Sequence, residues 1–356
     1  MKLTEDIIIQ EDIDAVATAD YIPWDSLKNK SILVTGATGL IGYQTVLAIL
    51  NVNKIKDLGM TVYAVVRNEE KANKMFALAK DDSLKFVVQD VLEPFTLTDK
   101  VDFIIHGASM TSSKDFVDYP VETIKTAIQG TENILEFAKK NQVEGMVYLS
   151  SLEVYGVVDF SVKKVPETLY GTLDPMSVRS SYSEGKRMVE CLCASYASEY
   201  NLPIKVVRLC QTFGPGVSYG DNRVFAQFAR SVMEGKDIVL KTDGSTERNY
   251  CYIKDTITGV LTVLLKGNKG EVYNIANKNT LITIRGMAEM LIEKYPESGT
   301  KLVFDIAEDV TKLGYNPKIV MNLDTEKIEK LGWSAEVDLP EMFARMINSM
   351  TASKNK

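Results

Sequence analysis

The chain has 356 residues, of which 45% are hydrophobic and 25% charged, so it is an ordinary folded protein too long for one small core. Its 41 Lys and Arg residues against 48 Asp and Glu residues give a formal net charge of -7, which argues against a nucleic-acid partner. There are one histidine, His106, and four cysteines without a Cys-x-x-Cys pair, so we expect no metal site.

Residues 1–29 mix acidic and apolar residues without a strand or helix rhythm, and we expect an extension that lies on the main body or is partly mobile. No apolar stretch follows a basic head, so no secretory signal is predicted. No run of about 18 uncharged apolar residues occurs either. We therefore expect a cytoplasmic protein that has no membrane partner.

From Ser31 onward, short apolar and β-branched runs alternate with longer helical patterns. Strands are predicted at 31–35, 61–66, 85–89, 101–106, 145–151 and 204–209, and helices from about Leu40, near 121–140 and near 182–200. This alternation is typical of a parallel sheet with helices on both faces. The predicted fold is α/β, a Rossmann-type doubly wound parallel sheet, and we assign residues 30–213 to it.

After about Gly214 the rhythm loosens into single strands at 237–240, 271–276 and 301–305, with scattered helices and Gly and Pro turns. We assign residues 214–356 mainly to a smaller carboxyl-terminal α/β lobe that binds the substrate. The two lobes are expected to interleave.

The first predicted strand runs directly into a glycine-rich turn, Thr35-Gly-Ala-Thr-Gly-Leu-Ile-Gly42. Gly36 permits the tight turn, Gly39 lets the backbone approach a pyrophosphate, and Gly42 lets the helix pack closely on the strand. The helix N-terminus would face the phosphate with free N–H groups. The turn predicts a dinucleotide, held by Gly36, Thr38, Gly39, Leu40, Ile41 and Gly42.

The residues after the second and third strands bear on which dinucleotide binds. An acidic residue after the second strand would bind the ribose of NAD, whereas an arginine can accept the 2′-phosphate of NADP. Arg67 stands there, so NADP is an alternative to NAD. Asp90 and Val91, after the third strand, are placed to meet the adenine.

Tyr182 and Lys186 lie four residues apart on one face of a predicted helix. A cation, and a positive nicotinamide, would lower the tyrosine pKa and make the phenolate a base for an alcohol hydroxyl. Ser151 ends a central strand, where ligands of open α/β sheets gather, and could hydrogen-bond the reacting oxygen. Tyr250 and Lys254 share the spacing but fall in a strand-like stretch, so we favour Tyr182.

One other motif, Gly216-Val-Ser218-Tyr-Gly220, has the spelling of a hydrolase nucleophile elbow. It lies in a glycine-rich loop rather than between a strand and a helix, and His106 precedes it in the chain. A serine hydrolase is therefore rejected.

Together these residues resemble the extended short-chain dehydrogenase/reductases, in their NAD-dependent epimerase/dehydratase branch. The resemblance rests on TGATGLIG (35–42), Asp90-Val91, HGAS (106–109), SSLEVYG (150–156), YSEGK (182–186), RLCQTFGPG (208–216) and RNYCYIKD (248–255). It implies a nicotinamide cofactor, a nucleoside diphosphate sugar as substrate, with UDP favoured, and a homodimer formed through paired helices. It also implies that Ser151, Tyr182 and Lys186 remove the C4 hydroxyl proton while hydride passes to NAD.

The resemblance extends to further site residues. It implies cofactor contacts by Gly107, Ala108, Ser109 and Leu209, in addition to Tyr182 and Lys186. It implies substrate contacts by Thr111, Ser112, Gln211, Arg223 and Arg248, the last a bidentate cation suited to a diphosphate.

The reaction outcome is left open between epimerisation and decarboxylation. We take Glu153 as a fourth catalytic residue. Glu153 and the stretch from Arg179 to Arg187 resemble the corresponding positions in UDP-glucuronate decarboxylases. The 4,6-dehydratases also have this Glu but precede it with an acidic Asp, where this chain has Leu152. Three positions depart from the family pattern: Arg67, Ala127 and Gln211.

Two other functions remain as alternatives. The first is an NADPH-dependent reductase of a small carbonyl compound, which Arg67 and the lysines near it would favour. The second is a regulator that senses a dinucleotide without catalysis, which the Tyr182–Lys186 pair disfavours.

Overall fold

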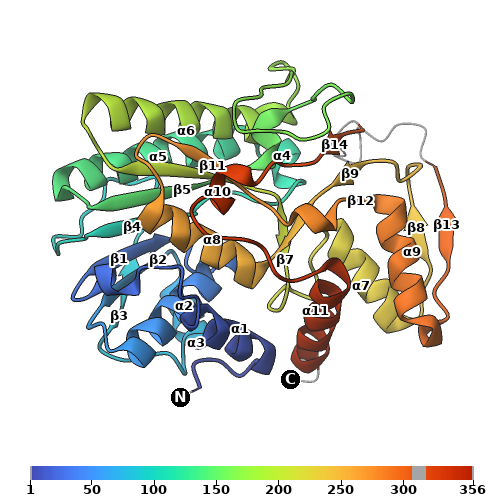
Figure 1. Ribbon diagram of the computed structural model, residues 1–356, viewed down its shortest axis with the longest axis horizontal. Helices are drawn as coiled ribbons and strands as arrows, with labels where there is room; N and C mark the ends of the chain where they lie inside the picture. Colours follow the sequence, from blue (N-terminus) through green and yellow to red (C-terminus); the bar gives the residue numbers. More distant parts are fainter. Residues whose placement is uncertain (1, 307–317, 355–356) are drawn as a thin grey trace.

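The computed structural model describes residues 2–306 and 318–354 of the chain. In this part, seven parallel strands form one sheet in the order β11-β6-β5-β4-β1-β2-β3 (Figure 1). The strands are β1 (Ser31–Thr35), β2 (Thr61–Val66), β3 (Leu84–Val88), β4 (Phe103–His106), β5 (Gly145–Ser151), β6 (Ile204–Leu209) and β11 (Val272–Ile275). The order reverses between β1 and β4, as in doubly wound nucleotide-binding folds. The predicted fold class is confirmed.

The central strands are buried along their whole length and mostly apolar, because both faces of the sheet are covered. Every residue of β1, β4 and β6 is buried. Helices α2 (Leu40–Lys56) and α8 (Ile253–Lys266) pack on one face, and α5 (Pro120–Asn141) and α6 (Ser180–Glu199) on the other (Figure 1). Two layers of helices around one sheet explain why the strand runs do not alternate with polar residues.

One strand lies elsewhere than the sequence pattern indicated. The run at 271–276 was expected in the smaller lobe, but β11 pairs with β6 at the edge of the main sheet. The chain therefore leaves the sheet after β6, builds part of the second lobe, and returns. Loose spacing of short strands could not show this, because pairing partners are not encoded in the local pattern.

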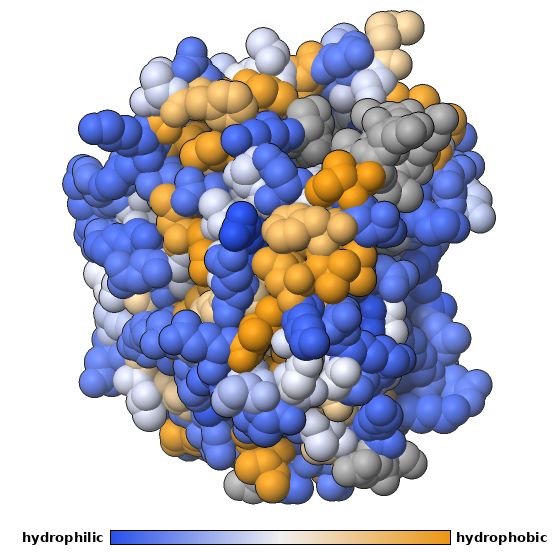
Figure 2. Space-filling view, turned by 90° about the vertical axis from the view of Figure 1, so that its right-hand side faces the viewer, coloured by the Kyte–Doolittle hydropathy of each residue, from blue (hydrophilic) through white to orange (hydrophobic). Residues whose placement is uncertain are grey.

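The smaller lobe is made of short paired strands and helices. Its strands are β7 (Gln211–Phe213) with β10 (Tyr250–Tyr252), β8 (Ile238–Leu240) with β13 (Leu302–Phe304), and β9 (Glu247–Arg248) between β12 (Ile282–Thr283) and β14 (Val320–Met321). Its helices are α7 (Val224–Glu234), α9 (Ile284–Lys294) and α11 (Leu339–Lys354), and the short helices of the chain are α3 (Glu69–Met75), α4 (Asp115–Asp118) and α10 (Glu326–Glu329). Figure 2 shows apolar side chains gathered on the face of this lobe, where Val239, Val303 and Phe304 are exposed on β8 and β13.

The amino-terminal residues form a helix, α1 (Ile7–Ala17), that lies on the main body beside α2, α8 and α11. Asp6 caps it by accepting hydrogen bonds from the amides of Ile8 and Ile9. Its inner face, which includes Ile9 and Ile13, is buried in the main core. A strand-helix rhythm is missing here because residues 2–29 contribute α1 and the short 3-10 helix η1 (Trp24–Leu27) but no strand.

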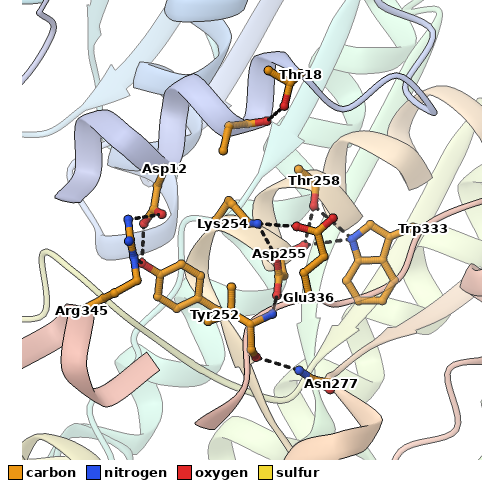
Figure 3. A network of polar contacts seen from close by, with 12 residues as sticks. Asp12, Thr18, Tyr252, Lys254, Asp255, Thr258, Asn277, Trp333, Glu336 and Arg345 are labelled. Carbon is orange, nitrogen blue, oxygen red and sulfur yellow. Dashed lines mark hydrogen bonds and ion pairs between the residues drawn. The ribbon is translucent and has the colours of Figure 1, made fainter. Parts of the chain in front are cut away.

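Polar contacts tie α1 to the smaller lobe (Figure 3). Arg345 of α11 donates to Asp12 of α1 at 2.9 Å and to the hydroxyl of Tyr252 at 2.7 Å. Tyr252 donates to the second oxygen of Asp12 at 2.6 Å. Because Asp12 is only 5% exposed, this network replaces the water that its carboxylate loses.

None of the helices in residues 2–306 and 318–354 has both the length and the apolarity needed to cross a bilayer.

Candidate active site

The turn between β1 and α2 is a cradle of bare backbone. Gly36 has a φ of 70°, and a Cβ there would lie 3.0 Å from backbone atoms of Gly107 and Ala108. A Cβ on Gly42 would lie 2.2 Å from the carbonyl oxygen of Gly36. Gly39 is the N-cap of α2 and no side chain caps it, so the first amides of the helix are free for an anion. This cradle fits the pyrophosphate of a dinucleotide.

A hydrogen-bond chain fixes the strand ends that line this cradle. Thr131 donates to the carbonyl of Ala127 at 2.6 Å, so it accepts from Nε2 of His106 at 3.0 Å. Nδ1 of His106 then accepts from Thr35 at 2.6 Å, and Thr35 in turn accepts from the amides of Gly107 and Ala108. The only histidine thus holds the predicted cofactor segment 107–109 against β1.

The residues predicted to meet the adenine lie after β2 and β3. Arg67 is largely exposed, and its guanidinium is 3.9 Å from the Asp90 carboxylate. Asp90 also accepts from the amide of Leu92 at 3.0 Å, and Val91 is buried. Arg67 therefore faces a carboxylate, which would repel the 2′-phosphate of NADP that Arg67 was expected to attract.

Ser151, Tyr182 and Lys186 come together at the carboxyl end of the sheet. Ser151 is the last residue of β5, and Tyr182 and Lys186 lie in the first two turns of α6. Lys186 donates to the carbonyl of Leu149 at 2.7 Å, and its Nζ is 5.7 Å from the centre of the Tyr182 ring. The end of β5 and the start of α6 therefore bring together three residues, of which the first and last, Ser151 and Lys186, are 35 positions apart in the sequence.

Burial dominates the ionisation of this group. It raises the pKa of Tyr182, and the negative charge of Glu153 adds to the rise, while a hydrogen bond with Ser151 and the charge of Arg179 oppose it. Burial also lowers the pKa of Lys186 to about 7, although the charge of Glu190 acts in the other direction. For the protein groups by themselves, burial thus outweighs the lowering of the tyrosine pKa that the sequence led us to expect.

Glu153 lies beside Tyr182 in the short helical turn η2 (Leu152–Tyr155) but is fully engaged. Its two oxygens accept from both terminal nitrogens of Arg179 at 3.0 Å, and Ser183 also donates to it at 3.0 Å. Leu152, at the position of the dehydratase acid, is buried in the main core. The site therefore holds a carboxylate paired with a guanidinium and no acid next to it in the chain.

Two residues near Tyr182 were not assigned from the sequence. Phe116 stacks on the Tyr182 ring, with centroids 4.2 Å apart and an angle of 11°. The guanidinium of Arg179 lies over the Phe116 ring, 4.9 Å from its centre. The signal for Arg179 was its place one helical turn before Tyr182, whereas nothing local distinguished Phe116.

A buried ion pair supports the end of β5 from behind. Glu190 of α6 accepts from Ser150 at 2.6 Å and from Arg208 at 2.6 Å. Arg208 also donates to the carbonyl of Glu167 at 2.8 Å. These contacts join α6 to β5 and β6, so that Ser151 and Leu209, which are paired in register, stay aligned.

Only some of the predicted substrate residues lie near the carboxyl end of the sheet or have donors left for a ligand. Gln211 follows Leu209 by two residues and pairs with Tyr250, so it lies close to the carboxyl end of β6. Nε of Arg248 and the hydroxyl of Tyr250 are both buried and have no hydrogen-bond partner among the residues that the structure describes, and the charge of Arg248 acts on Tyr250. Two unsatisfied donors close together indicate a place for a polar ligand.

Other candidates are engaged or exposed. Arg223 pairs with Asp221 at 2.5 Å and lies 4.8 Å from the Phe225 ring, so its charge is already balanced. Thr111 and Ser112 are exposed between β4 and α4. Of the predicted substrate residues, Gln211 thus lies opposite Tyr250, two residues after Arg248, whereas the others are engaged or exposed.

The alternative pair Tyr250 and Lys254 does not share a helical face. Tyr250 belongs to β10, and Lys254 belongs to α8, where it pairs with Glu336 at 2.6 Å (Figure 3). His106 is held by Thr35 and Thr131, so it cannot serve Ser218 as a base.

A cavity of about 480 Å³ lies between α6 and strands β6 and β11. Its lining includes Arg187, Cys191 and Val272 but none of Ser151, Tyr182 and Lys186. It is therefore outside the candidate active site.

Comparisons with known proteins agree with this geometry. Residues 32–276 match the sequence model of the NAD dependent epimerase/dehydratase family. The chain is 30% identical over 324 residues to UDP-glucuronic acid decarboxylase 5 of Arabidopsis thaliana, covering 88% of this chain and 87% of that protein. It is 29% identical over 303 residues to UDP-glucuronic acid decarboxylase 3 of the same plant, covering 82% and 85%.

Solved structures are similar over most of the chain. The UDP-glucuronic acid 4-epimerase of Bacillus cereus in complex with NAD superposes with a TM-score of 0.72 and 25% identity, covering 91% of this chain and 99% of that chain. The UDP-glucose 4-epimerase of Thermotoga maritima with UDP-glucose gives a TM-score of 0.74 at 24% identity, covering 91% and 99%. At 24% identity, the similarity to the Thermotoga maritima enzyme is a similarity of fold.

Proposed function

Because the chain belongs to the NAD dependent epimerase/dehydratase family, we propose that it is an NAD-dependent enzyme that modifies a nucleoside diphosphate sugar through transient oxidation at C4. The outcome is epimerisation or decarboxylation. The observation that carries this proposal is the convergence of Ser151, Tyr182 and Lys186 beside the glycine cradle at the carboxyl end of the sheet.

The residues present fit NAD. The bare backbone at Gly36 and Gly39 and the open N-terminus of α2 would hold its pyrophosphate, and Asp90 its adenosine end. Gly107 and Ala108, tied to Thr35, would line its path toward Tyr182. Bound NAD would accept the C4 hydride and return it within the same turnover. NAD is favoured over NADP because Asp90 faces Arg67.

The protein groups would handle the proton of the C4 hydroxyl. Tyr182 would accept that proton as the C4–H bond breaks, leaving a C4 ketone, and Ser151 would donate a hydrogen bond to the reacting oxygen. Since burial raises the pKa of Tyr182, the phenol can act as a base only when positive charge is brought beside it. Lys186 would supply part of that charge. Arg248 would hold the diphosphate of the substrate, with its unsatisfied Nε as a donor.

Both outcomes have support, and dehydration has less. The relatives in Arabidopsis thaliana are named as UDP-glucuronic acid decarboxylases, and a solved neighbour at 25% identity is a UDP-glucuronic acid 4-epimerase. These names also favour UDP as the nucleotide. Elimination of water would need an acid where Leu152 is buried, and Leu152 cannot donate a proton.

Product analysis tests the proposal. The purified protein is incubated with UDP-, GDP-, CDP- and dTDP-sugars, and the products are analysed by mass spectrometry while NADH absorbance is followed. We expect a UDP-sugar product of unchanged mass with altered retention, or one lighter by CO2, with no net change in NADH. Loss of water as the main reaction would contradict the proposed outcome. Steady consumption of NADPH with a small carbonyl compound would instead support the reductase alternative.

We further propose a cytoplasmic homodimer formed through α5 and α6. Val121 and Ile124 on α5 and Met188 on α6 are exposed apolar side chains on these neighbouring helices. All four cysteines are free thiols, which suits a reducing compartment.

A further inference from the structure

The ion pair of Glu153 and Arg179 is more enclosed than a surface contact. The side chains are 14% and 16% exposed, and two parallel hydrogen bonds of 3.0 Å join them. The hydroxyl of Ser183 gives the carboxylate a third donor at 3.0 Å, and within residues 2–306 and 318–354 the buried Nε of Arg179 has no partner. A paired geometry of this kind fixes both groups, because a buried guanidinium loses much if its carboxylate is removed.

The pair is connected to the Tyr182 ring by Phe116. The guanidinium of Arg179 lies 4.9 Å from the centre of the Phe116 ring, and this ring also stacks on Tyr182 with centroids 4.2 Å apart. Ser181 donates to the carbonyl of Phe116 at 2.9 Å, which holds α4 against α6. Arg179, Phe116 and Tyr182 therefore form a packed series in which the position of the phenol depends on the ion pair.

The two partners act on Tyr182 with opposite signs. The charge of Glu153 raises the pKa of Tyr182 and the charge of Arg179 lowers it, both acting beneath the larger effect of burial. The other ionisable groups on these elements are Lys114, Asp115 and Asp118 on α4, Tyr148 on β5, Tyr155 on η2, and Glu184, Lys186, Arg187, Glu190, Cys191, Cys193, Tyr196 and Glu199 on α6. Lys114 and Asp118 form an exposed pair at 2.8 Å, whereas Arg187 lies 3.9 Å from Glu184 and donates to the carbonyl of Val154.

We propose that Arg179 is a positioning residue of the reaction proposed above: its guanidinium holds Glu153 in place and balances the carboxylate charge beside Tyr182. Glu153, expected from the sequence to be catalytic, is then the second member of this positioning pair and not a proton acceptor.

The assignment bears on the reaction class. The ion pair with Arg179 occupies both oxygens of Glu153, and Ser183 donates to one of them as well. A carboxylate held in this way is poorly suited to take a proton from C5, the step that elimination of water requires. C4 epimerisation and loss of CO2 from a C4-keto uronate need no such base. The pair therefore deepens the proposed function by favouring these two outcomes.

The experiment measures how kcat depends on pH for the holoenzyme, with the nucleotide sugar that the wild type converts. The variants are Arg179→Met, Glu153→Gln and the double variant. In Arg179→Met the uncompensated Glu153 should move the acid limb of the profile upward, on the order of one pH unit. In Glu153→Gln the unpaired Arg179 should move it downward by a similar amount, about one pH unit, and the double variant should lie near the wild type.

Two further variants separate charge from packing. Arg187→Met removes the same charge from the same helix, where Arg187 donates to the carbonyls of Val154 and Gly171, and it should leave the acid limb in place. Arg179→Lys keeps the charge but not the two parallel bonds, so it should keep the limb near that of the wild type while kcat falls. Thermal unfolding of each variant verifies that it is folded.

Shifts of both single variants in the same direction, or no shift, would overturn the positioning role. Tyrosinate absorbance provides a readout that does not need turnover, by comparing each variant with its counterpart that also carries Tyr182→Phe. If the wild type converts no nucleotide sugar, the proposed function fails, and this difference titration still decides whether the pair controls Tyr182.

Discussion

At the scale of single residues, the site depends on groups whose ionisation the fold has changed. Tyr182 is made a weaker acid and Lys186 a weaker base by burial. Because burial disfavours the tyrosinate, Tyr182 gains its reactive charge only when positive charge is brought beside it. The proposed chemistry does not need a histidine base, since Tyr182 takes that role and the one histidine, His106, holds Thr35 and Thr131 in place.

Replacing Tyr182 by Phe should abolish most turnover while leaving the fold intact. The ring can keep its stack on Phe116, whereas the proton acceptor is lost, so kcat should fall about 100- to 10,000-fold. Steady-state assays and thermal unfolding provide the measurement. Tyr196→Phe is a matched control, since it removes a phenol hydroxyl bonded to Glu136 from the same helix but outside the site. Full activity in the Tyr182 variant would contradict the mechanism.

His106 should stay neutral throughout the physiological pH range. Burial lowers its pKa from 6.5 to about 3, and the charge of Lys186 acts in the same direction. The unfolded chain therefore binds more protons in this window, so the stability that neutral His106 contributes is lost as the pH falls from 6.5 toward 3.

The single histidine makes this prediction directly measurable by NMR of histidine-labelled protein. Its ring resonances should not move between about pH 8 and pH 5. A midpoint near the ordinary value would show that the contacts with Thr35 and Thr131 do not hold the ring as described.

At the scale of elements, α1 joins the two lobes. It packs on α2 of the main body, while Asp12 meets Arg345 of α11 and Tyr252 of the smaller lobe (Figure 3). Burial raises the pKa of Asp12 to about 6, although Tyr252 and Arg345 oppose the rise. The network is therefore sensitive to the loss of any one member.

Arg345→Met should destabilise the protein by about 2–3 kcal/mol, because it leaves a buried carboxylate without its cation. The loss is expected in the free energy of unfolding measured with urea. Arg285→Met, which breaks an exposed pair with Glu289, should change that energy by less than about 0.5 kcal/mol. Equal effects of the two variants would show that α1 is not held by this network.

At the scale of the whole molecule, two exposed apolar surfaces are candidates for the contact of the proposed dimer. One is on α5 and α6, and the other is the patch on β8 and β13 seen in Figure 2. Tyr182 belongs to α6, and α5 packs on α6. Contact between two copies through these helices would therefore restrict the motion of the helix that carries Tyr182.

Light scattering should give a mass twice that of the 39.6 kDa chain. The double variant Ile124→Glu and Met188→Glu should be monomeric, since a buried carboxylate in an apolar interface is unfavourable. Val239→Glu, on β8, should remain dimeric. A monomeric Val239→Glu protein would instead place the contact on β8 and β13.

The sequence by itself determined the alternation of strands and helices, the glycine cradle and the Tyr182–Lys186 pair. These features are local: buried strands must be apolar along their length, a tight turn at Gly36 needs a positive φ, and one helical turn fixes a spacing of four. Only the tertiary structure placed β11 in the main sheet, closed Glu153 onto Arg179, stacked Phe116 on Tyr182 and joined Asp12 to Arg345. Those contacts join residues 26 to 333 positions apart, and their partners are chosen by how loops and lobes pack, not by any pattern along the chain.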